Sequence, residues 1–165
     1  MKNYYPDCVK RRKMSLLTKL MANNILMAGI ISWLTAQALK TLVDAFVNKE
    51  INWQRLAGDG GMPSGHSATV TAVAATAGLQ CGFETPEFAI AAILAVIVMH
   101  DAMGVRREAG KQAKVINEMM NLFLDLGQPQ LSMEKKLKEL VGHTPLQVAA
   151  GCILGLLVSF IYYYR

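Results

Sequence analysis

One histidine of this chain follows a proline, a serine and several glycines, in the stretch Gly60–Ser67. The stretch reads Gly-Gly-Met-Pro-Ser-Gly-His-Ser, and apolar sequence begins directly after it. A proline with a small hydroxylic residue is a typical helix start, and the first N–H groups of a helix have no partner within it. Such a start can bind an anion, and His66 falls in its first turn, so the stretch predicts a phosphate site with a proton donor. A purely structural role, with Ser64 as the helix cap, explains the same residues.

A second polar cluster, His100–Ala113, follows an apolar segment and reads His-Asp-Ala-Met-Gly-Val-Arg-Arg-Glu-Ala-Gly-Lys-Gln-Ala. It contains the adjacent arginines Arg106 and Arg107. A pair of arginines at the end of an apolar segment is often an anchor at a membrane interface, because long side chains can reach the water from there. This interpretation stays open beside a role for the pair in the predicted phosphate site.

A third polar cluster, Gly142–Val148, precedes the last apolar segment and reads Gly-His-Thr-Pro-Leu-Gln-Val. Thr144, Pro145 and Gln147 have the spacing of a capping box, with the threonine as N-cap and the proline at the first helical position. This pattern predicts that a helix begins at Pro145. It leaves His143, directly before the cap, without a structural explanation.

The composition favours a membrane protein, because 53% of the 165 residues are apolar and only 18% are charged. A spanning helix needs about 20 mostly apolar residues. The segment 87–99 reaches that length only if Pro86 and Ala102-Met103 extend it, and the alanine- and threonine-rich segment 67–79 can span only if its small residues pack against other helices. The sequence therefore predicts an all-α integral membrane bundle of about four spanning helices, at residues 20–38, 67–79, 87–99 and 148–164.

A polar insertion at about residues 104–142 precedes the last predicted span, within a single membrane domain of residues 1–165. Apolar residues at helical spacing predict a helix over residues 107–126, which Gly127-Gln128-Pro129 ends. A second helix is expected from Ser132 to Val141, with Glu134 paired to Lys138 and Gly142 closing it. Its lysines and its apolar face predict that this helix lies at the membrane surface.

The net charge of +5 does not indicate a nucleic-acid partner, because the basic residues flank the spans and form no continuous face with aromatics. The basic run Lys10–Lys13 precedes the first span and favours a cytoplasmic N-terminus in a plasma or inner membrane. Three isolated cysteines have no metal-ligand spacing, so we expect free thiols and neither a metal nor another cofactor. They are Cys8, Cys81 and Cys152.

Four spans would bring the three polar clusters to one face of the membrane. The first cluster precedes the second span, the second cluster follows the third span, and the third cluster precedes the fourth span. His66 and His143 would then meet. This relative placement holds for either orientation of the chain in the membrane, and it gives modest support to a shared site.

The motifs AQALK, GGMPSGHSA, HDAMGVRREAGKQA and GHTPLQVAAG together resemble the divergent branch of the type 2 phosphatidic acid phosphatase superfamily. That superfamily is related to acid phosphatases and to vanadium-dependent haloperoxidases, and the resemblance covers most of the chain from Gln37 to Gly155. It implies a helical membrane bundle with acid-phosphatase-like chemistry, which hydrolyses phosphate esters, usually lipid phosphates, through a phosphohistidine and without a metal.

The resemblance also implies roles for individual residues. His143 would be the nucleophile and His66 the general acid for the leaving group. Fixed cations and backbone N–H groups would hold the charge of the phosphoryl group, which is what this chemistry requires. The phosphate ligands implied by the motifs are Lys40, Ser64, Gly65 and Arg106 or Arg107.

The chain departs from the pattern of the superfamily at several points. Val47-Asn48 stands where the first motif has Arg-Pro, with Arg55 as a conceivable substitute, and Gln147 replaces the aspartate that supports the nucleophilic histidine. An amide oxygen can accept the imidazole N–H but does not stabilise an imidazolium as a carboxylate does, so we expect weaker activity unless Asp101 supplies the charge. The alternative to a lipid phosphatase is a non-catalytic membrane protein that binds phosphate head groups, or a structural subunit.

Overall fold

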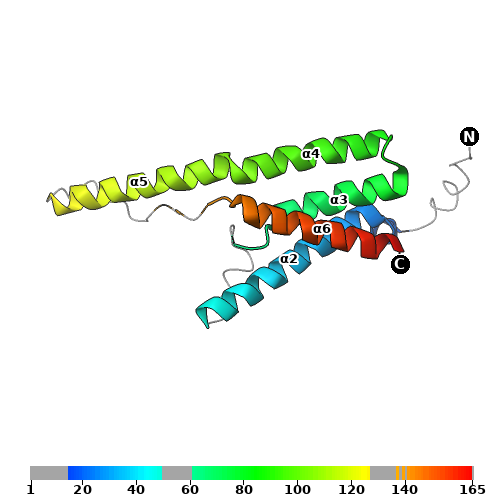
Figure 1. Ribbon diagram of the computed structural model, residues 1–165, viewed down its shortest axis with the longest axis horizontal. Helices are drawn as coiled ribbons and strands as arrows, with labels where there is room; N and C mark the ends of the chain where they lie inside the picture. Colours follow the sequence, from blue (N-terminus) through cyan, green and yellow to red (C-terminus); the bar gives the residue numbers. More distant parts are fainter. Residues whose placement is uncertain (1–14, 50–60, 127–136, 138, 140, 165) are drawn as a thin grey trace, which may run out of the picture.

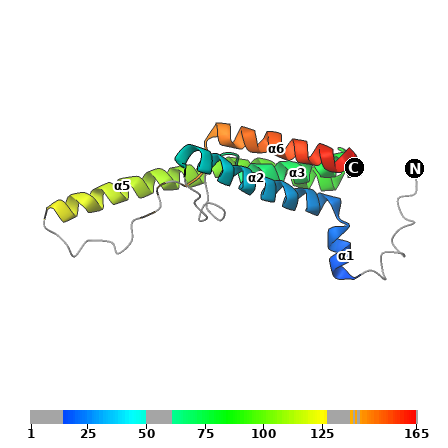
Figure 2. The same cartoon turned by 90° about the horizontal axis from the view of Figure 1, so that it is seen from below.

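The computed structural model describes residues 15–49, 61–126, 137, 139 and 141–164. Within these residues the chain forms helices and no strands, which confirms the predicted all-α class. Figures 1 and 2 show a bundle of helices with one long helical arm beyond it. The helices are α1 (Leu16–Met21), α2 (Asn24–Asn48), α3 (Gly65–Cys81), α4 (Pro86–Met103), α5 (Val105–Asp125) and α6 (Pro145–Tyr164).

Three segments of the described residues are long and apolar enough to cross a membrane. They are Asn24–Phe46, Pro86–Asp125, which joins α4 and α5, and Pro145–Tyr164. The expected extension of the segment 87–99 is confirmed, because α4 runs from Pro86 to Met103. The chain is therefore a multi-pass membrane protein. The predicted span at residues 67–79 corresponds to α3, which has 17 residues and is not among these segments, so a total of four spans stays a prediction.

Helix α3 packs against α2, α4 and α6 (Figure 1). Its contact with α6 is a backbone contact, because a Cβ built on Gly151 would lie 2.5 Å from the Ser64 carbonyl oxygen, and one on Gly155 would lie 2.5 Å from that of Ala68. The small residues of α3 thus pack against other helices, as the sequence required of this segment. Those that are buried are Gly65, Ser67, Ala68, Ala72, Ala74, Thr76, Ala77 and Gly78.

Two hydroxyl groups in this contact region form hydrogen bonds to neighbouring helices. Ser32 on α2 donates through Oγ to the carbonyl oxygen of Ala68 at 2.9 Å, and Thr76 donates through Oγ1 to Ser159 Oγ at 3.0 Å. Both bonds are buried and join segments far apart in the chain. Buried hydroxyls of this kind tie α3 to α2 and α6, because an unpaired polar group is costly away from water.

Helix α5 follows α4 after Gly104 and extends beyond the bundle (Figures 1 and 2). It confirms the helix predicted over residues 107–126, with slightly different ends. The predicted helix Ser132–Val141 is wrong where the structure describes it, because Leu137, Glu139 and Val141 are not helical.

The side-chain amide of Asn117 explains this difference. Its Nδ2 donates to the carbonyl oxygen of Leu137 at 2.9 Å, and its Oδ1 accepts from the Leu137 N–H at 3.0 Å. The backbone groups of Leu137 that an isolated helix would pair internally are thus bonded across to α5. Several predictions concern residues outside the described part of the chain: Cys8, Lys10–Lys13, Arg55, Gly60, Gly127-Gln128-Pro129 and the pair of Glu134 with Lys138.

Candidate functional site

His66 lies at the start of α3, as predicted. Ser64 caps the helix, since its Oγ accepts from the Ser67 N–H at 3.3 Å, and the Ser67 hydroxyl donates to the same Oγ at 3.0 Å. Ser64 and Gly65 are buried, and His66 in the first turn is partly exposed. The structural reading of Ser64 is therefore confirmed, and the cap leaves the histidine at the helix terminus where the dipole favours an anion.

The start of α6 is the capping box that the sequence predicts. The helix begins at Pro145, the Thr144 N–H donates to Gln147 Oε1 at 3.0 Å, and the Gln147 N–H donates to Thr144 Oγ1 at 3.4 Å. The same Oε1 lies 3.3 Å from Nδ1 of His143. One side-chain oxygen thus contacts both the helix cap and the histidine.

This shared oxygen determines which nitrogen of His143 carries a proton. Because the Thr144 N–H donates to Gln147 Oε1, the amide has its oxygen, not its nitrogen, toward the imidazole. The bond between His143 and Gln147 then requires Nδ1–H as the donor. In the neutral ring Nε2 therefore carries the lone pair, which is the state that a nucleophilic nitrogen needs.

The two motif histidines meet, as the parity of the spans predicts. The ring centroids of His66 and His143 are 5.7 Å apart, with an interplanar angle of 65°. His143 is only 3% exposed, and its backbone N–H donates to the carbonyl oxygen of Ala102 at 2.9 Å. The Ser64 N–H donates to the backbone carbonyl of Gln147 at 3.0 Å. These bonds join the start of α3, the end of α4 and the start of α6, so one ligand can contact both rings.

The first-motif lysine reaches the loop that leads into α3. Lys40 on α2 is 5% exposed, and a Cβ on Gly61 would lie 3.1 Å from its Cγ. Gly61 has φ +87°, which L side chains rarely adopt. A glycine at this point thus permits both the turn and the close packing of the lysine stem against it.

The adjacent arginines Arg106 and Arg107 lie at the start of α5, close to the segment that precedes His143. Arg106 Nε donates to Asp101 Oδ2 at 2.8 Å, with both side chains 41% exposed, and Arg107 is exposed. Asp101, which we considered as a source of charge for His143, is thus an ion-pair partner of Arg106. Gly142 has φ +85°, and a Cβ there would lie 2.5 Å from the Arg107 backbone nitrogen. The segment before His143 can therefore approach α5 this closely only because residue 142 is a glycine.

Sequence reasoning missed the backbone groups that hold the site together. Neither the acceptor at Ala102 nor the close approach of Gly142 to Arg107 follows from a motif. The sequence does contain a signal for Gly142, because a glycine directly before a motif histidine can mark a positive φ. The local pattern instead predicts that Gly142 ends a helix at Ser132–Val141, and the described residues of that segment are not helical.

The chain is similar to known proteins over most of its length. A family model described as "Divergent PAP2 family" matches residues 21–158, a range that contains Lys40, His66, both arginines and His143. The "Uncharacterized membrane protein YuiD" of Bacillus subtilis (strain 168) is 38% identical over 154 residues, which cover 88% of this chain and 98% of that protein. No solved structure matches the chain.

Proposed function

The chain belongs to the divergent PAP2 family, and on this premise we propose that it is a membrane phosphatase acting on lipid phosphate or diphosphate esters. The reaction proceeds through a phosphohistidine and needs no metal ion. The observation that carries the proposal is the buried His143, held through Nδ1 by Gln147 and 5.7 Å from the ring of His66.

The first step transfers the phosphoryl group to the protein. The Nε2 lone pair of His143 attacks the terminal phosphorus, and the bond from phosphorus to the ester oxygen of a monophosphate, or to the bridging oxygen of a diphosphate, breaks. Protonated His66 gives its proton to the departing oxygen. The products of this step are the free alcohol, or the lipid monophosphate from a diphosphate, together with phosphorylated His143 and neutral His66.

The second step releases phosphate. Water attacks the phosphorus of the phosphohistidine, and neutral His66 accepts the proton that the water loses. The bond between phosphorus and nitrogen breaks, which returns the electron pair to Nε2 of His143 and frees inorganic phosphate. Both histidines are then restored to their starting states.

Negative charge on the phosphoryl group needs fixed positive partners. The N-terminus of α3 supplies backbone dipoles, with Ser64 and Gly65 at its start, and the lysine and arginine candidates come from α2 and α5. The support for this part of the proposal is the packing of the Lys40 stem on Gly61 and of the Arg107 backbone against Gly142.

A lipid substrate is supported by where the site lies along the helices. The histidines are at one end of the bundle, beside the start of α6 and the end of α4, both of which belong to segments long and apolar enough to span. Head groups lie at the ends of spanning helices, so a lipid phosphate can reach this depth without leaving the bilayer.

Gln147 favours a second candidate, a protein that binds phosphate head groups without hydrolysing them. The neutral amide stands where the superfamily has an aspartate, and it cannot stabilise a charged imidazole as a carboxylate does. Asp101 is engaged by Arg106 at 2.8 Å. In this alternative the same cations and helix starts bind the anion, and no bond to phosphorus forms.

Phosphate release by the purified protein, in detergent and in lipid nanodiscs, distinguishes the two candidates. We expect turnover of phosphatidic acid or of a prenyl diphosphate, unchanged by a metal chelator and lost in His143→Ala. His100→Ala is the matched control, because His100 is exposed on α4 and has no role in the proposed reaction. Binding of these lipids with no phosphate release from any of them would reject the phosphatase and support the second candidate.

A further inference from the structure

Two residues of α5 are buried although most of this helix lies beyond the bundle (Figures 1 and 2). They are Gly110 and Asn117, and the asparagine is only 5% exposed. Neither residue type favours a helix interior, so helix stability does not explain either position. Both residues contact the chain that leads to His143, and these contacts point to a role in the candidate site.

The side-chain amide of Asn117 holds both backbone groups of one residue in that chain. Its Nδ2 donates to the Leu137 carbonyl oxygen at 2.9 Å, and its Oδ1 accepts from the Leu137 N–H at 3.0 Å. The same Nδ2 donates to Glu139 Oε1 at 2.8 Å. An amide side chain has two N–H donors and one acceptor oxygen, so Asn117 uses all three groups on this chain. Leu137 is thereby fixed both in its position along α5 and in its orientation.

The same chain lies directly against the backbone of α5 at Gly110. A Cβ there would overlap the Glu139 carbonyl oxygen and would lie 3.1 Å from that of Val141. The Val141 N–H donates to the same Glu139 oxygen at 3.0 Å. At Gly142 the chain again touches α5, because a Cβ there would lie 2.5 Å from the Arg107 backbone nitrogen. With the bonds of the asparagine, α5 thus holds this chain at three successive points.

The chain between the first and the last of these points has little slack. Asn117 and Arg107 are ten residues apart on α5, which corresponds to a rise of about 15 Å. Leu137 and Gly142 are five residues apart, and five residues of fully extended chain reach about 17 Å. A displacement of the chain at Asn117 is therefore passed on to Gly142 and to His143 directly after it.

We propose that Asn117 is a positioning residue for His143, and that it acts by anchoring residues 137–142, the anchored segment, along α5. The His143 backbone N–H donates to Ala102 at 2.9 Å, and Nδ1 faces Gln147 Oε1 at 3.3 Å. The second of these bonds is long, so a small displacement of the histidine breaks it first. The ring then has no fixed tautomer, and the lone pair is no longer held on Nε2. The effect on catalysis rests on the proposed function, whereas the placement of His143 does not.

Nitrogen-15 labelling of histidine tests this placement in the full chain. The three histidines give three imidazole signals, which His66→Ala, His100→Ala and His143→Ala assign. In nanodiscs at alkaline pH we expect the His143 proton on Nδ1 in the unaltered chain, and a mixture of both tautomers in Asn117→Leu. Asn121→Leu is the matched control and should keep the Nδ1 proton, because Asn121 is exposed on the same helix. The same His143 signal in Asn117→Leu as in the unaltered chain would overturn the proposal.

Gly110→Ala tests the anchor without changing the asparagine. The new methyl group would displace the Glu139 carbonyl, whereas alanine favours a helix more than glycine does. Helix content by circular dichroism should therefore not fall, while the His143 tautomer should shift as in Asn117→Leu. Lys111→Ala is the control, since its side chain is 60% exposed and the change should leave the signal as it is. A folded Gly110→Ala protein with an unchanged His143 signal would equally refute the anchor.

Turnover separates this proposal from that of a phosphatase. In Asn117→Leu we expect kcat to fall several-fold with KM near its original value, because the candidate phosphate ligands on α2 and α3 do not depend on the anchored segment. An Asn117→Leu protein with less folded material but the same kcat per folded molecule would have lost only stability, which would refute the positioning role. If the unaltered chain releases no phosphate, the phosphatase is wrong, and the tautomer of His143 still decides whether Asn117 positions it.

Discussion

At the level of single residues, Gln147 has two tasks that depend on one atom. Its Oε1 accepts from the Thr144 N–H, which caps α6, and it also faces Nδ1 of His143 at 3.3 Å. Glutamate can accept both hydrogen bonds in the same geometry and adds a negative charge. The cap and the electrostatic support of the histidine can therefore be separated by one substitution.

We predict that Gln147→Glu increases the rate of phosphate release if His143 is the nucleophile. A neighbouring carboxylate stabilises the imidazolium and raises the pKa of the imidazole, so the acidic limb of the pH–rate profile moves to higher pH. The thermal midpoint should barely change, because the cap is kept. Gln147→Leu is the control, since it loses both hydrogen bonds and should cost about 1 kcal/mol of helix stability as well as turnover. A Gln147→Glu protein with the same rate at every pH would argue against the phosphohistidine.

We predict that Gly61→Ala destabilises the protein where the loop before α3 packs against Lys40. In Gly61→Ala the new methyl group would lie 3.1 Å from Lys40 Cγ, and φ is +87°. An L residue in the left-handed region costs about 1–2 kcal/mol, so the midpoint of thermal unfolding should fall. Gly65→Ala is the matched control, because the nearest atom, Trp33 Cδ1, is at 3.6 Å, an ordinary contact. A larger loss of stability in Gly65→Ala would mean that the loop at Gly61 has more freedom than its packing indicates.

At the level of elements, the contact between α3 and α6 determines how close the two histidines lie. A Cβ on Gly151 would lie 2.5 Å from the Ser64 carbonyl oxygen and 2.9 Å from Ser67 Cβ. Neither contact can be relieved by rotating a side chain. Gly151 therefore controls the spacing between the starts of the two helices that carry His66 and His143.

We expect Gly151→Ala to move α6 away from α3 and to destabilise the protein by about 1–3 kcal/mol, as overpacking does. Phosphate release should fall further than the stability loss alone explains, because the Ser64–Gln147 backbone bond is at the displaced end. Ala149→Val adds bulk to an exposed position of the same helix and should leave both quantities near their original values. The measurements are the unfolding midpoint and the turnover of folded protein. A Gly151→Ala protein with unchanged turnover would separate the site from this packing.

The elements show which parts of the structure are predictable from sequence. The starts of α3 and α6 are predictable because capping is local: Ser64 acts on Ser67, and Thr144 acts on Gln147. The helix expected at Ser132–Val141 fails because Asn117, about twenty residues earlier, bonds to the backbone of Leu137. A local pattern does not contain such a long-range contact.

The candidate site divides in the same way. The number of predicted spans between His66 and His143 places both histidines at one face of the membrane, and this expectation needs no knowledge of long-range contacts. The pairing of Asp101 with Arg106 could not be predicted, since the arginine follows α4 across the break at Gly104. The same holds for the bond from His143 to Ala102, which depends on how α6 packs beside the end of α4.

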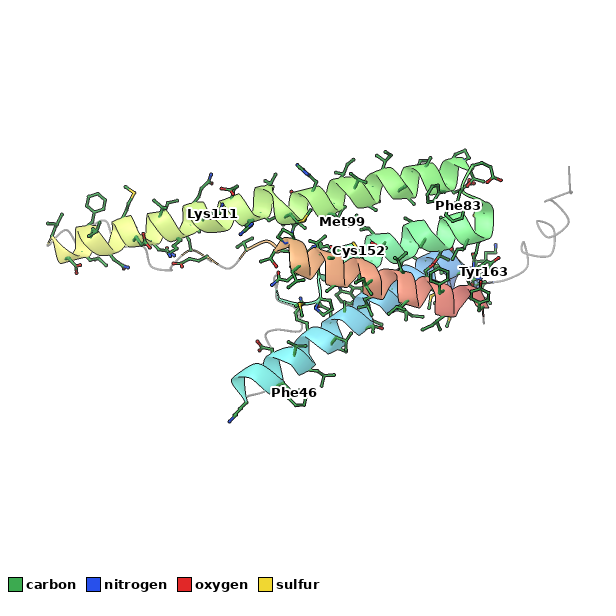
Figure 3. The ribbon with its side chains drawn as sticks, in the orientation of Figure 1. Phe46, Phe83, Met99, Lys111, Cys152 and Tyr163 are labelled. Carbon is green, nitrogen blue, oxygen red and sulfur yellow. The ribbon has the colours of Figure 1, made fainter. Side chains whose placement is uncertain are left out.

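At the level of the whole molecule, the site takes residues from most of the bundle and lies at one end of it. Figure 3 shows Phe83 and Tyr163 at the opposite end, where α3 turns into α4 and where α6 finishes. Met99, about one turn before the end of α4, contacts Cys152 of α6, with the cysteine donating to Met99 Sδ at 3.2 Å. An anion bound at the site would add a further contact between the starts of α3 and α6 and the end of α4, which the backbone hydrogen bonds of Ser64 and His143 already join.

We predict that phosphate or vanadate raises the thermal midpoint of the whole bundle, because a ligand that binds only the folded state stabilises it. At a concentration of about 100 times Kd the gain is about 2.7 kcal/mol. Joint neutralisation in Arg106→Gln/Arg107→Gln should weaken the anion affinity and reduce this gain. Lys111→Gln/Lys114→Gln removes the same charge from a more distant part of α5 and should keep the gain. Equal losses in both double variants would indicate only a diffuse charge effect, and no loss in the arginine variant would assign the twin arginine to the membrane interface.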